Sequence, residues 1–311
     1  MSFSPLLTRR SARRRTVVLA AALGVVVAVA TAGCTAGGQD GADASRSGAG
    51  ADVSGAVVGT ATPAGAGAGS DEGPAPFPAG AGFDYQLGAS YDPPAGTTVV
   101  VRDSTAEPAA GAYGVCYVNG FQTQPGVEWP EELLVHDSSG ELLVDPGWPD
   151  EHLFDLARAD TRQAVAARMA DTIDDCAADG YDAVEFDNLD SYGRSEGAFD
   201  LDDAVAYATL LVGHAHEAGL AAAQKNTAEL EARGRDEIGF DFAVVEECDF
   251  YRECADFTDV YGDRVLAVEY DDELRDTFAE ACARPETPSS TILRDRDLVG
   301  PDDEGYVFDR C

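Results

Sequence analysis

From Phe83 onward the sequence alternates short apolar segments with amphipathic ones, and this alternation restricts the fold more than any other feature. Eight segments have the apolar, β-branched character of strands, and helical patterns separate most of them. Strands that alternate with helices over roughly 230 residues predict a parallel α/β architecture, and eight strands favour a single (β/α)8 TIM barrel over an open sheet. The segments are Asp84–Gly88, Thr98–Asp103, Ala112–Gly120, Asp182–Asn188, Ala221–Asn226, Asp241–Glu247, Val265–Tyr270 and Ser290–Asp295.

The residues before Phe83 do not belong to this pattern. In residues 1–34, five arginines precede the apolar run Thr16–Gly33, and Cys34 follows directly, which is typical of an export signal. The ending Ala32-Gly33-Cys34 resembles a bacterial lipobox, although Thr31 stands where Leu is usual, so we expect lipidation of Cys34. An uncleaved membrane anchor is the alternative, because the run is nearly long enough to span a bilayer. The arginine pair Arg9-Arg10 also allows twin-arginine export.

Residues 35–82 consist largely of Gly, Ala, Ser and Pro, and have little to bury. Such a composition predicts a disordered, flexible linker. We therefore expect residues 83–311 to form one extracytoplasmic domain, either tethered to the membrane by the lipid anchor or secreted.

Six cysteines remain after Cys34, and an even number in an exported domain predicts disulfides. The short spacing of Cys248 and Cys254 makes these two a pair, and Cys282 with Cys311 would tie the C-terminal segment to the last helix. Cys116–Cys176 then follows by elimination. A zinc site is the alternative, but no Cys-x2-Cys pair or histidine stands at ligand spacing. We expect no metal and no cofactor.

The formal net charge of −36 argues against binding to nucleic acid or anionic lipid and favours cationic partners. Solvation of the surface is the simpler explanation of so many acidic residues. One lysine, Lys225, stands among bases that are otherwise all arginine. We expect a monomer.

Polar side chains follow the apolar part of several strand segments. In a (β/α)8 barrel the active site lies at the carboxyl ends of the strands, so these residues would gather in one mouth. They are Asp187 and Asn188, Lys225 and Asn226, Glu246 and Glu247, Glu269 and Tyr270, and, on an earlier strand, Arg102 and Asp103.

The segment Asp182–Asn188 contains acids within an otherwise apolar strand. Side chains alternate between the faces of a strand, so Glu185 and Asp187 point the same way, about 7 Å apart. Val184 and Phe186 suit the helix-packing face, which leaves the two acids facing the barrel axis. The deeper Glu185 needs a partner, for which we expect Lys225. A Schiff-base role for this lysine is the alternative.

Two carboxylates on either side of a glycosidic bond are the usual apparatus for hydrolysing it. Asp187 and Glu246 lie on strands separated by one other strand and would face each other across part of the mouth. Asp190 and Tyr192, on the loop beyond Asp187, would hold substrate. We therefore expect a glycosidase that acts in carbohydrate metabolism.

Five motifs together resemble glycoside hydrolase family 114, in order and spacing: Tyr85–Gly88, Gly180–Tyr192, Ala215–Asn226, Phe240–Cys254 and Val265–Tyr270. The resemblance implies a (β/α)8 barrel with endo-α-1,4-polygalactosaminidase activity, and thus a galactosamine-containing polysaccharide as partner. It assigns the catalytic acids to Asp187 and Glu246. Here Val245 replaces the usual Asn and Glu247 the usual Gln, so Glu247 competes for the second role.

The N-terminal half matches this family less well. The segment Asn119–Pro130 lacks the acid and arginine that follow the family's third strand, whereas Gly147–Leu156 keeps a Trp, an acid and Asp155, which we expect to bind substrate. The reaction is thus better defined than the substrate. The alternatives are a hydrolase of another α-linked polysaccharide and a non-catalytic carbohydrate-binding lipoprotein. A carboxylate-rich mouth argues against a structural envelope protein.

Overall fold

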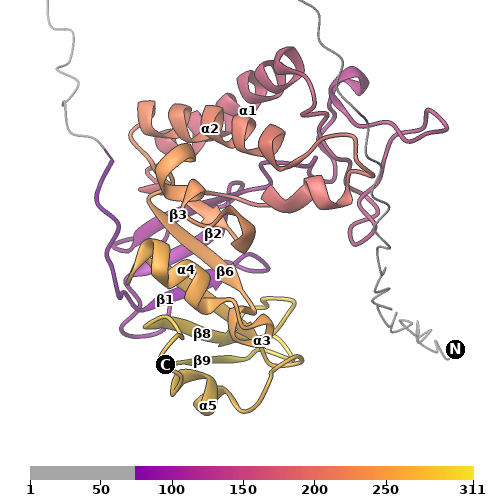
Figure 1. The fold of residues 1–311 in the computed structure, drawn as a ribbon. Helices are drawn as coiled ribbons and strands as arrows, with labels where there is room; N and C mark the ends of the chain where they lie inside the picture. Colours follow the sequence, from indigo (N-terminus) through magenta and orange to yellow (C-terminus); the bar gives the residue numbers. More distant parts are fainter. Residues whose placement is uncertain (1–73) are drawn as a thin grey trace, which may run out of the picture. The chain divides into compact units, whose positions relative to one another are not determined.

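A computed structural model of the chain describes residues 74–311, which form an α/β domain around a curled sheet of nine strands (Figure 1). The expected signal, its lipidation site Cys34 and the linker up to residue 73 lie outside the described residues. The strands follow one another across the sheet in chain order, and every strand segment expected from the sequence forms one of them. They are β1 (Phe83–Gln86), β2 (Val99–Asp103), β3 (Tyr113–Val118), β4 (Ala183–Phe186), β5 (Ala221–Lys225), β6 (Phe242–Glu246), β7 (Val265–Tyr270), β8 (Ser290–Arg294) and β9 (Phe308–Arg310).

The first eight strands are parallel, whereas β9 pairs antiparallel with β8. A strand has two hydrogen-bonding edges, so β9 occupies the edge of β8 that β1 would need to close a barrel. Side chains join the two instead: the buried guanidinium of Arg294 on β8 lies 3.0 Å from Asp84 on β1 and also donates to the carbonyl of Tyr85. The sheet is thus curled and consistent with a TIM-like barrel, but among the described strands β1 and β8 form no backbone ladder.

The helices lie between the strands, as the alternating pattern predicts. Figure 1 shows the two long helices α1 and α2 side by side. The helical pattern of the sequence starts at Asp271, but helix α5 begins only at Phe278, because Thr277 and Glu280 form a capping box there. The helices are η1 (Glu131–Leu133), α1 (Ala159–Asp179), η2 (Leu189–Arg194), α2 (Leu201–Glu217), η3 (Ala228–Leu230), the π-helix η4 (Gly234–Ile238), α3 (Cys248–Tyr251), α4 (Cys254–Tyr261) and α5 (Phe278–Cys282).

The sheet is buried on both faces, as parallel sheets usually are. Inside the curl, aliphatic and aromatic residues from all eight parallel strands pack together, Tyr85 and Phe242 among them. On the outer face, Val184 and Phe186 of β4 pack with residues of the helices. The alternation along β4 therefore turns Glu185 inward.

Some contacts of the described domain are made by residues before Phe83. The ring of Phe77 stacks on Phe242 with 4.1 Å between ring centroids, and the amide of Gly80 donates to the carbonyl of Asp263 at 2.9 Å. The low-complexity composition hides this because a single aromatic residue, Phe77, makes the contact with the sheet.

Three disulfides, Cys116–Cys176, Cys248–Cys254 and Cys282–Cys311, join the same cysteines that were paired from the sequence. They indicate an oxidising compartment. Within residues 74–311, no helix has both the length and the apolar character needed to span a bilayer.

Candidate active site

Lys225 is the centre of a cluster of acids at the carboxyl end of the sheet. Its side chain is 2% exposed, and its Nζ lies 3.1 Å from Glu185 Oε1, 3.3 Å from Asp187 Oδ1 and 3.2 Å from Glu246 Oε2. It also donates to the hydroxyl of Tyr85 at 3.1 Å. One ammonium group thus faces three carboxylates that come from β4, the residue after it, and β6.

The surroundings shift the pKa values of Glu185 and Asp187 in opposite directions. Burial raises the pKa of Glu185 to about 7, although Lys225 pulls it down. Burial also acts to raise the pKa of Asp187, but Lys225, the Tyr117 hydroxyl and the Asn188 amide outweigh it, so that this pKa is lowered. Burial lowers the pKa of Lys225, yet the three acids raise it well above its ordinary value. Asp187 and Lys225 are therefore both charged at neutral pH.

Asp187 and Glu246 are the two acids of the cluster that reach solvent, with side chains 20% and 26% exposed. The Tyr117 hydroxyl donates to Asp187 Oδ2 at 2.5 Å, and the Tyr270 hydroxyl donates to Glu246 Oε1. On Glu246 the backbone amide also donates to Asn226 Oδ1 at 2.8 Å. Each acid is thus held by a tyrosine while one side remains open to a ligand.

The two acids lie close together because they share the lysine. Asp187 Oδ1 and Glu246 Oε2 can be no more than about 6.5 Å apart, which is their two distances to Nζ added together. Glu185 lies deeper and is fully buried, with its Oε2 lacking a hydrogen-bond partner among the described residues.

The chain turns sharply at the top of β4, β5 and β6. Asn188, Asn226 and Glu247 all have positive φ values, of 62°, 46° and 58°. Asparagine tolerates this left-handed conformation better than most residues, whereas the backbone of a glutamate is strained there. The turns let the strands end directly beneath Asp187 and Glu246, so these side chains project from the rim of the sheet.

The structure places the competing acid Glu247 away from Lys225. Its carboxylate pairs with Arg296 at 2.7 Å. Asp190 pairs with Arg194 at 2.7 Å, and the Tyr192 hydroxyl bonds to Glu229 on the loop after β5. These loop residues surround the cluster without contacting the lysine.

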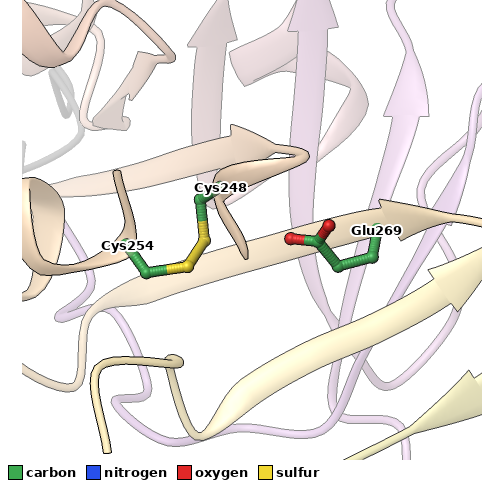
Figure 2. Close-up of side chains that lie close together, drawn as sticks. All are labelled: Cys248, Cys254 and Glu269. Carbon is green, nitrogen blue, oxygen red and sulfur yellow. A yellow bond between two sulfur atoms is a disulfide. The ribbon is translucent and has the colours of Figure 1, made fainter. Parts of the chain in front are cut away.

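Glu269 and Asp155, both expected to contact substrate, lie elsewhere. Glu269 alternates with Tyr270 on β7 and therefore faces the outer side of the sheet, where it is fully buried and accepts from the Asp249 amide at 2.8 Å. Figure 2 shows its carboxylate pointing toward the disulfide Cys248–Cys254. Asp155 accepts from the Ala157 amide in the turn before α1, at 3.1 Å. The sulfurs beside Glu269 are bonded to each other, so they are not free to bind a metal.

Several residues of the site were missed from the sequence. Tyr85 and Tyr117 lie on β1 and β3, where strand parity could have placed them beside the acids. Arg194, Asp145 and Glu151 come from loops whose irregular sequence carries no periodic signal. Arg194 pairs with Asp145 at 2.6 Å and donates to Asn188 Oδ1 at 2.9 Å, so it links two of these loops to the residue that follows Asp187.

Two solvent-reaching carboxylates at the carboxyl ends of a curled α/β sheet are the arrangement that a glycoside hydrolase needs, and comparison with known families identifies the class. The model of glycoside-hydrolase family GH114 matches residues 64–311. The chain belongs to this family.

Comparison with solved structures shows the same fold. The structure is similar to Ega3 of Aspergillus fumigatus in complex with galactosamine, with a TM-score of 0.60 and 21% identity, over 75% of this chain and 96% of Ega3. It also matches the glycoside hydrolase domain of PelA from Pseudomonas aeruginosa, with a TM-score of 0.48 and 17% identity, over 74% of this chain and 99% of that domain. A search of curated proteins gave no significant match.

Proposed function

We propose that this glycoside hydrolase cleaves an α-linked, galactosamine-containing polysaccharide within the chain, with Asp187 and Glu246 as its catalytic residues. The observation that carries the proposal is the placement of these two acids around Lys225 at the open end of the sheet. Family membership supports the reaction, and the galactosamine bound to Ega3 supports the sugar. We take the fold to be a (β/α)8 barrel whose seam between β1 and β8 is filled by β9 and Arg294.

The charge of the whole chain suits an amino sugar. Its formal net charge of −36 attracts a cationic polymer. A partly deacetylated galactosamine polymer carries ammonium groups, whereas neutral glucans do not.

We propose a retaining mechanism. The two carboxyl groups lie about 5–5.5 Å apart in retaining glycosidases and roughly 6.5–9.5 Å apart in inverting ones. The Asp187 and Glu246 oxygens that share Lys225 are no more than about 6.5 Å apart, which favours the retaining class. Asp187, whose pKa is lowered, attacks the anomeric carbon as the nucleophile while Glu246 gives a proton to the departing oxygen. Glu246 then takes a proton from water, which displaces Asp187 and restores both acids.

The remaining side chains have supporting roles in this proposal. Lys225 and Tyr117 keep Asp187 ionised, and Tyr270 and Asn226 orient Glu246. Asn188, Asp190 and Tyr192 border the mouth and would contact the sugar chain. Glu247 is too strongly engaged by Arg296 to be the second acid.

The test is product analysis with the full-length chain purified in detergent. Substrates are α-1,4-linked polygalactosamine, its N-acetylated form, and a panel of other α-linked polymers. We expect oligosaccharides from the galactosamine polymers, and none from Asp187→Asn or Glu246→Gln. Glu247→Gln is the matched control and should stay active. Azide should rescue a nucleophile variant Asp187→Gly by forming a glycosyl azide.

Each other outcome identifies an alternative. If the enzyme cleaves only another polymer of the panel, its substrate is a different α-linked polysaccharide. Binding without products in the wild type makes the chain a carbohydrate-binding lipoprotein. If Glu247→Gln is inactive while Glu246→Gln is active, the second catalytic acid is Glu247 and not Glu246.

We also propose that the chain is exported and anchored through a lipid on Cys34, at the cell surface. The apolar run that ends at this cysteine and the oxidised cysteines of the domain support this. Cys34→Ala should move the protein from the detergent phase to the aqueous phase on phase partitioning. If the variant stays in the detergent phase, the apolar run itself is the anchor.

A further inference from the structure

The turn formed by residues 145–151, in the long loop between β3 and α1, holds an exposed tryptophan on a rigid base. Trp148 is 63% exposed, whereas the Asp145 side chain is 1% exposed. Asp145 Oδ1 accepts from the amides of Gly147 and Trp148, at 2.7 and 3.2 Å, and the Trp148 carbonyl accepts from the Glu151 amide at 3.0 Å. A single exposed aromatic residue is common on protein surfaces, so the feature that distinguishes Trp148 is its place in a turn bonded to the site.

Two chains of hydrogen bonds connect this turn with the catalytic Asp187. In the first, Asp145 Oδ2 accepts from Arg194, which donates to Asn188 Oδ1 at 2.9 Å. In the second, Asn188 Nδ2 donates to Asn119 Oδ1 and Asn119 Nδ2 donates to Glu151 Oε2, each at 2.9 Å. Both end on Asn188, the residue after Asp187, so the turn borders the Asp187 side of the mouth.

Glu151 has no ion-pair partner among the described residues. Its carboxylate bonds to the amide of Asn119, and within residues 74–311 no lysine, arginine or histidine lies within 4.0 Å of it. Burial raises its pKa, the Asn119 amide lowers it, the charges of Asp145 and Asp187 raise it, and the charge of Arg194 lowers it, with a net increase. A ligand cation beside Glu151 would relieve this repulsion.

We propose that the turn 145–151 is a binding subsite for an amino sugar of the polysaccharide, where the Trp148 indole covers one face of the ring and Glu151 accepts a hydrogen bond from the sugar ammonium. A pyranose has a face of C–H groups that packs on an aromatic ring, and the amine lies at its edge. Because the turn is already rigid, little conformational entropy is lost on binding. This inference rests on the proposed function and adds to it the residues that recognise the amine.

The test compares Trp148→Ala and Glu151→Gln with the wild-type chain on polymers of galactosamine and of N-acetylgalactosamine. Leu210→Ala, which truncates an exposed apolar side chain on α2, is the control. We expect Trp148→Ala to raise KM about 10-fold on both polymers with little change in kcat. Glu151→Gln should raise KM for the deacetylated polymer by a similar factor and leave the N-acetylated one unchanged.

Fluorescence gives a second reading that does not depend on cleavage. The chain has two tryptophans, and Trp129 is packed against Phe154, so Trp148 reports on ligand directly. Galactosamine oligosaccharides added to the Asp187→Asn variant should change its emission, and the change should be lost when Trp148→Phe is added. Wild-type cleavage with unchanged KM in both subsite variants would overturn the subsite. A Trp148 signal without any cleavage would overturn the proposed function and keep the subsite.

Discussion

Tyr85 and Lys225 are 140 residues apart in the chain, yet the ammonium of the second donates to the hydroxyl of the first at 3.1 Å. One lies on β1 and the other on β5, which are far apart in the order of the sheet. They meet only because the sheet curls until its first strand approaches its fifth across the interior. The cluster around Lys225 therefore depends on the curl, and any change that flattens the sheet should dismantle the site.

Replacing Lys225 by Met should both destabilise the protein and remove activity. The substitution leaves three buried or partly buried carboxylates without their shared cation, and breaking such a pair costs about 3–5 kcal/mol. Activity should fall by roughly 100-fold or more, because the acids then repel each other and lose their positions. Denaturant unfolding and product release measure the two effects. A variant with normal activity would contradict the central role of this lysine.

Tyr117→Phe should move the acidic limb of the pH–activity profile to higher pH. The Tyr117 hydroxyl helps to lower the pKa of Asp187, so its removal lets that pKa rise. In the proposed mechanism Asp187 must be ionised to attack, and the variant should therefore lose activity first at acidic pH. The profile of kcat/KM against pH checks this, with Tyr251→Phe on α3 as an exposed-tyrosine control. An unchanged acidic limb would mean that Asp187 does not set it.

Glu185 should make the stability of the protein depend on pH. Its pKa is about 7 when folded against an ordinary value of 4.5, so the folded state holds the proton more tightly than the unfolded state. This contribution is fully present below about pH 4.5 and is lost as the pH rises through about 7. It amounts to about 3 kcal/mol from the difference in pKa. Unfolding of Glu185→Gln from pH 4 to 8 should show a flatter curve than wild type.

Glu269 serves as the matched control for Glu185. Burial raises its pKa to about 7 as well, but it lies on the outer side of the sheet. Glu269→Gln should flatten the stability curve over the same pH range and leave the pH–activity profile in place, while Glu185→Gln alters both. If both variants change the activity profile equally, the effect comes from stability and not from the mouth.

The three disulfides should contribute unequally to stability. A crosslink that closes a longer loop removes more entropy from the unfolded chain. The sequence separations of 60, 29 and 6 predict losses of roughly 4, 4 and 2 kcal/mol when Cys116–Cys176, Cys282–Cys311 and Cys248–Cys254 are replaced by serine pairs. Cys248 follows Glu246 closely, so the removal of its disulfide should also reduce activity. Equal losses would show that strain or unfolded-state structure dominates.

Strand pattern and parity predict most of the interior of the domain. The alternation in Asp182–Asn188 turns Glu185 and Asp187 inward because a buried strand must present its side chains on two faces in turn. The same rule, applied to β7, places Tyr270 and Glu269 on opposite faces of the sheet. The rule that polar residues at strand ends gather in the mouth predicts the opposite for Glu269. Strand parity already places Glu269 on the face of β7 opposite to Tyr270.

The loops could not be predicted in the same way. Asp145, Glu151 and Arg194 reach the site through hydrogen bonds between segments that lie far apart in the chain. No periodicity marks these residues, since their side chains are placed by the loop and not by a helix or strand. The approach of β9 to β8 is similarly hidden, because three residues are too few to form a strand signal.

The strand β9 has a consequence for how the protein is made. A nascent chain that has emerged only as far as Arg294 contains all eight parallel strands, but not the strand that covers β8 or the partner of Cys282. It exposes an unpaired strand edge and a free thiol, both of which invite association with other chains. The final steps of folding must therefore wait for residues 308–311, and the domain needs protection until those residues arrive.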